Sequence, residues 1–404
     1  MLIALSLLNM MGMSMLIPVM PFVVQQYLPA GGNMALWVGI LESINAVCAF
    51  LVAPVLGGLS DRIGRRWIII GSAFGAALGY AVFGIGGALW VLVVGRIVQG
   101  LTSGDMPALF AYAADITKPE ERAKRFGLLG ALFGIGMMVG PGLGGLLAAI
   151  DLQAPVFAAA GLSLVAAILG VFLLPESLAA HNRKSSIELS ELNVFTAMRS
   201  AFKRTDLRGL LIAYVLVTIP FVVFSNNIGV AAYDAVGWSA TQVGLLVSVI
   251  GVLDIVIQGG LLGLLLPRIG ERAVVVSGIV TQAVGCLGIA IVAQGLPVAA
   301  VMAAGALIMA SGQGFAQATT DALLSTSVSE AEQGWLAGVL QSLATGCQML
   351  APVLAGLVYS GLGHAVPYWA GLVMILAAAL VFARTKTSTP GAPEDAARTS
   401  LPVA

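Results

Sequence analysis

Long apolar stretches alternate with short polar segments along the whole chain. Each stretch is close to the roughly 20 apolar residues that a helix needs to cross the hydrocarbon core of a bilayer. A helix is the expected form because it satisfies its own backbone hydrogen bonds in lipid. Twelve spanning helices are predicted, at approximately 2–27, 35–57, 66–86, 88–114, 124–148, 153–174, 207–232, 240–266, 271–293, 295–324, 332–360 and 364–384.

Two segments interrupt or end this pattern. The stretch 175–206 is polar and separates the first six helices from the last six. The tail 385–404 is rich in Thr, Pro and Ala, and we expect it to be disordered. The pattern therefore predicts an all-α polytopic membrane protein. Its two six-helix bundles, residues 1–174 and 207–384, are joined by a central loop on the cytoplasmic side, and the tail lies on that side too.

The composition agrees with a chain dissolved in lipid. Hydrophobic residues make up 59% of it and charged residues only 9%, whereas soluble domains carry about 25% charged residues. So few charges cannot cover a water-soluble globule of 404 residues. The three cysteines lie in apolar stretches without metal-ligand spacing, so we expect buried thiols, no metal and no cofactor.

The basic residues are distributed unevenly between the predicted connections. If both termini are cytoplasmic, all of the 19 Lys and Arg residues except Arg96 fall on the cytoplasmic side. The outer connections, near 28–34, 149–152 and 233–239 among others, carry none. This is the positive-inside pattern of a multi-pass inner-membrane protein. Met1 leads almost directly into the first helix without a basic leader or a small-residue cleavage site, so we do not expect a cleaved signal peptide.

The two halves of the chain repeat one another. The segments 57–66 and 263–272 share Gly, Leu, Arg, Ile, Gly and Arg at equal spacing, and Pro141 corresponds to Pro352. Parallel repeats of this kind place a substrate site between the halves, near the middle of the membrane.

The first of these repeated loops resembles the signature of the major facilitator superfamily. It reads Gly57-Gly-Leu-Ser-Asp61-Arg62-Ile-Gly64-Arg65-Arg66, which matches the pattern G-x-L-x-D-R-x-G-R-R. A glycine permits close packing or a tight turn, and the acid can pair with an arginine or with the N-terminus of a helix. The resemblance implies a loop that closes the inner gate in the outward-open state. The residues expected to form it are Gly57, Asp61, Arg62, Gly64, Arg65 and Arg66.

The predicted fifth helix is similar to the antiporter motif of the drug:proton group in that superfamily. Glycines four residues apart lie on one helical face and allow helices to cross closely, and ordinary glycine packing is the alternative reading. The chain departs from the tetracycline-type exporters at Asn9 and Gly79, where those proteins carry acids, and its seventh helix lacks an acid found in some related drug exporters. The motif residues are Gly136, Gly140, Pro141, Gly144 and Gly145.

Four charged residues lie well inside predicted spans: Glu42, Arg96, Asp105 and Asp254. Such residues are costly in a bilayer and indicate a functional site. Glu42 and Arg96 lie at similar depth, so we expect them to pair and to take part in proton coupling, with a purely structural ion pair as the alternative. We expect Asp105 or Asp254 to carry the coupling proton, and a hydrogen-bonded structural acid is the alternative for each.

The resemblance implies that the first, fourth, seventh and tenth helices line the substrate cavity. These helices offer methionines, aromatic rings and amides but no cluster of Arg or Lys, which favours a small lipophilic, neutral or weakly cationic substrate. The residues expected to line the cavity are Asn9, Met13, Gln99, Phe221, Phe224, Asn226, Asn227, Gln313 and Gln317.

The sequence predicts a monomeric secondary transporter that exports such molecules in exchange for protons by alternating access. An enzyme is not expected, because neither a P-loop nor a nucleophile–base constellation is evident and the only histidines are His181 and His364. Binding to nucleic acid is not expected either. A solute:proton symporter and a non-transporting membrane sensor or scaffold stay open as alternatives.

Overall fold

The computed structural model describes residues 2–118, 121–179, 183, 194–329 and 332–385, and all regular secondary structure in these ranges is helical. The tail predicted to be disordered lies outside the described residues, except for Thr385. The helices of the first half are α1 (Leu2–Met15), α2 (Met20–Gln26), α3 (Met34–Ile63), α4 (Arg65–Ile85), α5 (Leu89–Leu101), α6 (Asp105–Asp115), α7 (Arg122–Ala148) and α8 (Ala154–Leu173).

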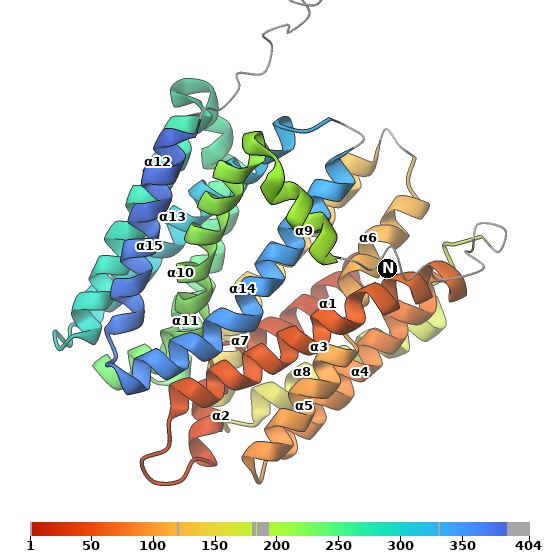
Figure 1. The fold of residues 1–404 in the computed structure, drawn as a ribbon. Helices are drawn as coiled ribbons and strands as arrows, with labels where there is room; N and C mark the ends of the chain where they lie inside the picture. The colour runs from red at the N-terminus through yellow and green to blue at the C-terminus, as the bar shows by residue number, and fades with distance from the viewer. Residues whose placement is uncertain (1, 119–120, 180–182, 184–193, 330–331, 386–404) are drawn as a thin grey trace, which may run out of the picture.

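A short helix, α9 (Val194–Lys203), lies in the segment that joins the two halves. The helices of the second half are α10 (Thr205–Val236), α11 (Ala240–Val256), the π-helical turn η4 (Ile257–Leu261), α12 (Leu262–Ala293), α13 (Ala299–Thr326), α14 (Gln333–Gly361) and α15 (Val366–Arg384). Figure 1 shows how these two sets of helices are arranged.

The described helices account for twelve membrane crossings. Nine helices are long and apolar enough to cross by themselves, and α1 with α2, bent by 47°, makes a tenth crossing. α5 and α6 follow one another across a three-residue break and together make another. The continuous helix Ala240–Ala293 has 54 residues, about twice the length of one crossing. It makes two crossings, because the non-helical backbone of Gly270 divides it.

Two predicted spans are broken where the sequence analysis expected single helices. The first helix bends at 16–19, where Pro18 has no N–H to continue the ladder of hydrogen bonds. The fourth stops at 102–104, and α6 begins immediately afterwards at Asp105. Gly104 donates its backbone N–H to the Ser72 hydroxyl at 3.3 Å, which holds the break against α4. Asp105 therefore lies at a helix N-terminus in the middle of a crossing.

The internal repeat is visible in matching contacts. Gly64 and Gly270 occupy equivalent turns and both have positive φ, +113° and +78°. One guanidinium nitrogen of Arg66 donates to the carbonyl of Val171 at the end of α8, and Arg272 does the same to Ala383 at the end of α15. Each basic side chain thus satisfies the last carbonyls of the sixth helix of its own half.

The two halves meet through α3 with α14 and through α7 with α11. Gly39 of α3 packs directly on the backbone of Pro352 in α14, and Gly244 of α11 packs on the carbonyl of Pro141 in α7. Because Pro141 and Pro352 are equivalent in the repeat, these two helix–helix contacts are equivalent as well. Asn33 donates to the Ser360 hydroxyl beside the first crossing. We call the membrane side nearest these contacts the closed side, and the side that carries the turns at Gly64 and Gly270 the basic side.

On the basic side the two halves are apart. Glycines in the basic halves of the crossing helices, among them Gly260 and Gly338, would present a Cβ to open space. In Figure 1 the two sets of helices come together near α2 and spread apart toward α9. The structure therefore represents a state that is open toward the basic side.

Candidate functional site

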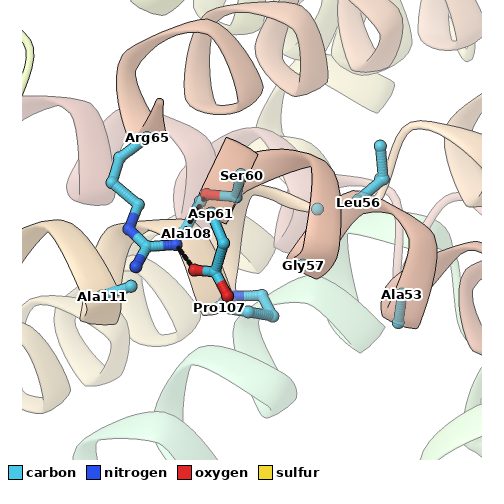
Figure 2. Close-up of a pocket in the computed structure, with 10 residues that line it drawn as sticks. Ala53, Leu56, Gly57, Ser60, Asp61, Arg65, Pro107, Ala108 and Ala111 are labelled. Atoms are coloured by element: carbon cyan, nitrogen blue, oxygen red, sulfur yellow. Dashed lines mark hydrogen bonds and ion pairs between the residues drawn. The ribbon is translucent and has the colours of Figure 1, made fainter. Parts of the chain in front are cut away.

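The loop between α3 and α4 is held by a network of charges. Asp61 accepts a hydrogen bond from Arg65, whose Nε lies 3.4 Å from Asp115 Oδ2 at the end of α6. The backbone N–H of Arg65 donates to Glu176 Oε1 at 2.9 Å. Figure 2 shows Asp61 and Arg65 beside a cavity of about 220 Å³ between α3 and α6, which Gly57 also lines.

These contacts join α3, α4 and α6 of the first half with the start of the central segment directly after α8, and none of these groups belongs to the second half. Arg66 is bound to Val171, and Arg62 is exposed. The Gly64 turn is also tightly enclosed, because a Cβ there would overlap the Glu176 carboxylate. In this open state the loop is thus tied to its own bundle. Its role as a gate stays a prediction.

A buried ion pair lies near the middle of the first bundle. Arg96 on α5 is only 7% exposed, and its Nη2 lies 2.5 Å from Glu42 Oε2 on α3. Its other terminal nitrogen donates to Gln99 Oε1 at 2.8 Å, and its Nε donates to the carbonyl of Leu41. The predicted pairing of Glu42 with Arg96 is present. It neutralises a cation that would otherwise be very costly at this depth.

Asp105 faces Asn9 on α1, whose side-chain amide donates to Asp105 Oδ2. As the first residue of α6, Asp105 also lies where backbone N–H groups lack helical partners and favour a carboxylate. Gly79 on α4 leaves no room for an acid, because its Cβ would overlap Gln99 and the carbonyl of Gly95. These are the two positions at which the chain departs from the tetracycline-type exporters. At Gly79 a neighbouring side chain occupies the space that an acid would need, and Asn9 contacts the carboxylate of Asp105.

Asp254 lies on α11, immediately before the π-helical turn η4. Gln258, one helical turn later, donates to its Oδ1 at 2.7 Å, and the Asp254 carboxylate approaches Gly314 of α13. π-helical turns inside longer helices frequently mark functional positions. The role of Asp254 in proton coupling stays a prediction.

The residues predicted to line one substrate cavity occupy several environments in this state. Met13 is half exposed, whereas Phe224 and Asn227 are buried. Phe221 packs on Phe224 with ring centroids 5.8 Å apart, and Asn226 donates to the carbonyl of Val222 in its own helix. Of the remaining residues, Gln99 is bound to Arg96, Asn9 is bound to Asp105, and Gln313 and Gln317 are bound to each other on α13. A single lining made of all nine residues is therefore not formed here.

α13 carries a polar row that the sequence analysis identified only in part. Gln313 donates to Gln317 at 3.1 Å, and Gln317 donates to both carboxylate oxygens of Asp321 at 3.3 and 3.4 Å. Gln282 of α12 donates to Gln313 at 2.9 Å. Asp321 was missed because it lies only three residues from the predicted end of its span, and the four-residue spacing from Gln313 was the signal that could have found it.

The antiporter-like helix α7 faces both halves. Gly136, Gly140 and Gly144 pack directly on the backbone or side chains of α1. Ser14 of α1 donates its hydroxyl to the Gly136 carbonyl at 2.9 Å. Gly145, on another face, packs on the first turn of α11. α7 therefore connects its own bundle with the opposite one.

A further ion pair lies where α9, α10 and α14 meet on the basic side. Glu332 precedes α14, and its Oε2 accepts hydrogen bonds from the backbone N–H and the hydroxyl of Ser329. Arg204 lies 2.9 Å from its other oxygen. The hydrogen bonds from Ser329, and then the charge of Arg204, hold the pKa of the Glu332 carboxyl below its ordinary value.

Twelve crossings in two related bundles, open to one side and with paired charges at mid-depth, define the class of polytopic secondary transporters. Sequence comparison gives the family: the model described as Major Facilitator Superfamily matches residues 2–259 and 210–404. The chain belongs to the Major Facilitator Superfamily.

Relatives and solved structures extend over nearly the whole chain. The chain is 35% identical to "Tetracycline resistance protein, class C" of Escherichia coli over 379 residues, covering 92% of this chain and 91% of that protein. It is 27% identical to "Multidrug resistance protein 2" of Bacillus subtilis (strain 168), covering 91% and 90%. The crystal structure of the nucleoside transporter NupG has the same fold, with a TM-score of 0.78 and 13% identity over 95% of this chain and 98% of that one.

Proposed function

We propose that this protein exports lipophilic drug-like molecules from the cytoplasm in exchange for protons, and that tetracyclines are among its substrates. The similarity to tetracycline and multidrug resistance proteins over more than nine-tenths of the chain supports export. The basic side is then the cytoplasmic side, with both chain ends on it, as the distribution of Lys and Arg suggests. The transporter works as a monomer, because each bundle packs against the other within one chain.

The observation that carries the proton coupling is the contact between Asp105 and Asn9. Asp105 lies at the break within a crossing, where it accepts hydrogen bonds from the Asn9 amide and from backbone N–H groups. Within the described part of the chain it forms no ion pair with a cation. Such a carboxylate can exchange between a charged and a protonated form as the bundles move. The Arg96–Glu42 pair is already neutral and serves to hold α3 and α5 together beside it.

The geometry suggests how proton binding and movement are linked. α1 carries Asn9 and Ser14, and the glycines of α7 pack on this helix close to Ser14. A change of charge on Asp105 alters its hold on α1, and α7 passes the resulting shift to α11 of the other bundle. Alternation between the two sides therefore follows the protonation of Asp105, with Asp254 as the acid that faces α13.

The test uses an efflux-deficient bacterial host that expresses the chain. We expect lower accumulation of tetracycline and of a lipophilic cationic dye, and a protonophore should abolish the difference. Asp105→Asn should be inactive at unchanged expression, whereas Asp151→Asn, an exposed acid in an outer turn, should be active. Increased uptake of a nutrient would favour the symporter instead, and no effect on any compound would favour the scaffold.

A further inference from the structure

A chain of side-chain amides runs through the second bundle and ends at a carboxylate. It consists of Gln282, Gln313, Gln317 and Asp321, and we call it the glutamine chain. Every bond in it has the same direction, because each amide nitrogen donates toward Asp321, and Gln313 and Gln317 each accept at their oxygen from the preceding amide. Gln282 is fully buried, so the chain connects the interior of the bundle with the carboxylate.

Asp321 lies near the basic side, which is the open side of the structure. It is five residues from the end of α13, or about 7–8 Å along the helix axis. The chain therefore begins in the interior of the membrane and ends within reach of water on that side.

The surroundings of Asp321 supply little positive charge. Among the residues that the structure describes, it forms no ion pair with Lys, Arg or His. Tyr214 of α10 is close enough to interact electrostatically with Asp321, and Cys347 of α14 interacts in turn with Tyr214; neither group is a cation. Asp254 of α11 approaches Gly314, which lies seven residues before Asp321 on α13. The guanidinium of Arg272 on α12 is bound to α15. A proton is the species that neutralises a carboxylate placed in this way.

One buried atom at the other end of the chain lacks a partner. Gln282 Oε1 has no hydrogen bond within the described part of the protein, although the residue is fully buried. If the amide group of every glutamine rotated by 180°, the Gln313 nitrogen would donate to Gln282 Oε1, and this oxygen would gain a hydrogen bond. Gln282 would then give up its present bond to the carbonyl of Val217, which is 3.2 Å long. The two directions therefore differ by one hydrogen bond, which the carboxylate form keeps.

The protonation of Asp321 decides between these directions. The carboxylate only accepts, so it orients the Gln317 nitrogen toward itself. The protonated acid donates its O–H to the Gln317 oxygen instead, and each following amide must turn in response. The chain is thus a two-state element whose direction one proton sets.

We propose that Asp321 is a proton-binding site of the second bundle, and that the glutamine chain carries its charge state to Gln282 in the interior. This inference rests on the proposed exchange of substrate for protons. It adds a second proton site, in the half of the molecule opposite Asp105. The chain links α12 to α13 and, through the bond from Thr218 to Gln317, to α10. Reversal therefore changes the contacts among three helices that pack together.

The test is infrared difference spectroscopy on the purified full-length protein in lipid nanodiscs, between acid and alkaline pH, about pH 5 and about pH 9. We expect a component in the carboxylic-acid C=O region that Asp321→Asn removes and Asp151→Asn leaves intact. Asp321→Glu should restore a shifted component, which separates loss of the acid from misfolding. A spectrum of Asp321→Asn identical to that of the parent protein would overturn the assignment.

The relay is tested separately with Gln317→Leu, which interrupts the chain but keeps the acid. The Asp321 component should then move in frequency, and the pH-dependent change in the side-chain amide region should be lost. An unchanged amide signal would refute the relay. Because these spectra need no transport, a parent protein that shows the component but moves no protons with drug would contradict the proposed function and leave the site standing.

Discussion

The close contact of Gly39 with Pro352 provides a direct test of the alternating arrangement. A Cβ on Gly39 would lie 2.7 Å from the Pro352 carbonyl carbon and 3.0 Å from Val353 Cα. Ordinary carbon–carbon contacts are about 3.5–4.0 Å, so Gly39→Ala requires α3 and α14 to separate by about 1 Å. This strain exists only while the closed side is closed. It should therefore favour the state in which the two helices are apart on that side.

The size of the shift follows from the cost of overpacking, about 1–3 kcal/mol. A bias of that size changes the ratio of two states by about 5- to 150-fold. Gly161→Ala on α8 is the matched control, because a Cβ there would meet no atom within 4 Å. It should leave the ratio unchanged.

The assay is pulsed electron–electron double resonance, which measures the distribution of distances between spin labels at Ala30 and Leu362, two exposed positions on the closed side. The three native cysteines, Cys48, Cys286 and Cys347, are first replaced. We expect Gly39→Ala to enrich a longer distance and Gly161→Ala to match the parent protein. Identical distributions for both variants would mean that α3 and α14 do not separate on the closed side during the cycle, contrary to the arrangement described.

Three further outcomes are expected. Glu42→Gln leaves buried Arg96 without its counter-charge and should lower the free energy of unfolding by about 1–3 kcal/mol. Adding Arg96→Gln should recover part of this loss in thermal unfolding, and losses that simply add in the double variant would contradict the pairing. Gly140→Ala forces α7 away from α1 and should reduce transport several-fold, whereas Gly130→Ala, with no atom within 4 Å of its Cβ, should be active in the same assay. Because the pKa of Glu332 is lowered in the folded protein, its charge contributes fully to stability above the ordinary Glu pKa of about 4.3, and the contribution is lost as pH falls through the lower folded-state pKa. Hydrogen exchange in the first turn of α14 should therefore become faster over that pH range, and Glu332→Gln should remove this pH dependence.

Much of the fold could be predicted from the sequence because the membrane imposes simple requirements. Helix length and apolar composition located the crossings, and the repeated glycine turns identified the two related halves. The break before Asp105 was not predicted, because Gly104 and Pro107 interrupt an apolar stretch that has the right total length for one helix. Such a break depends on what α4 offers the freed backbone, in this case the Ser72 hydroxyl.

The candidate site was harder to predict than the fold. Depth along two helices was enough to suggest Glu42 as the partner of Arg96, because a buried cation needs a nearby acid. The contact between Asn9 and Asp105 could not be inferred in the same way, since it depends on how α1 crosses α6. The glutamine chain was only half recognised, because Gln282 is on another helix and amides carry no charge that signals a site.

The exchange of drug for protons is tested most directly in proteoliposomes that contain only this protein. A pH-sensitive dye is trapped inside, an acid interior is imposed, and tetracycline is added outside. We predict that tetracycline accumulates in the vesicles while the interior becomes more alkaline, and that Asp105→Asn abolishes both changes. Tetracycline uptake that proceeds without any proton movement, or proton loss that does not depend on the drug, would contradict a coupled exchange.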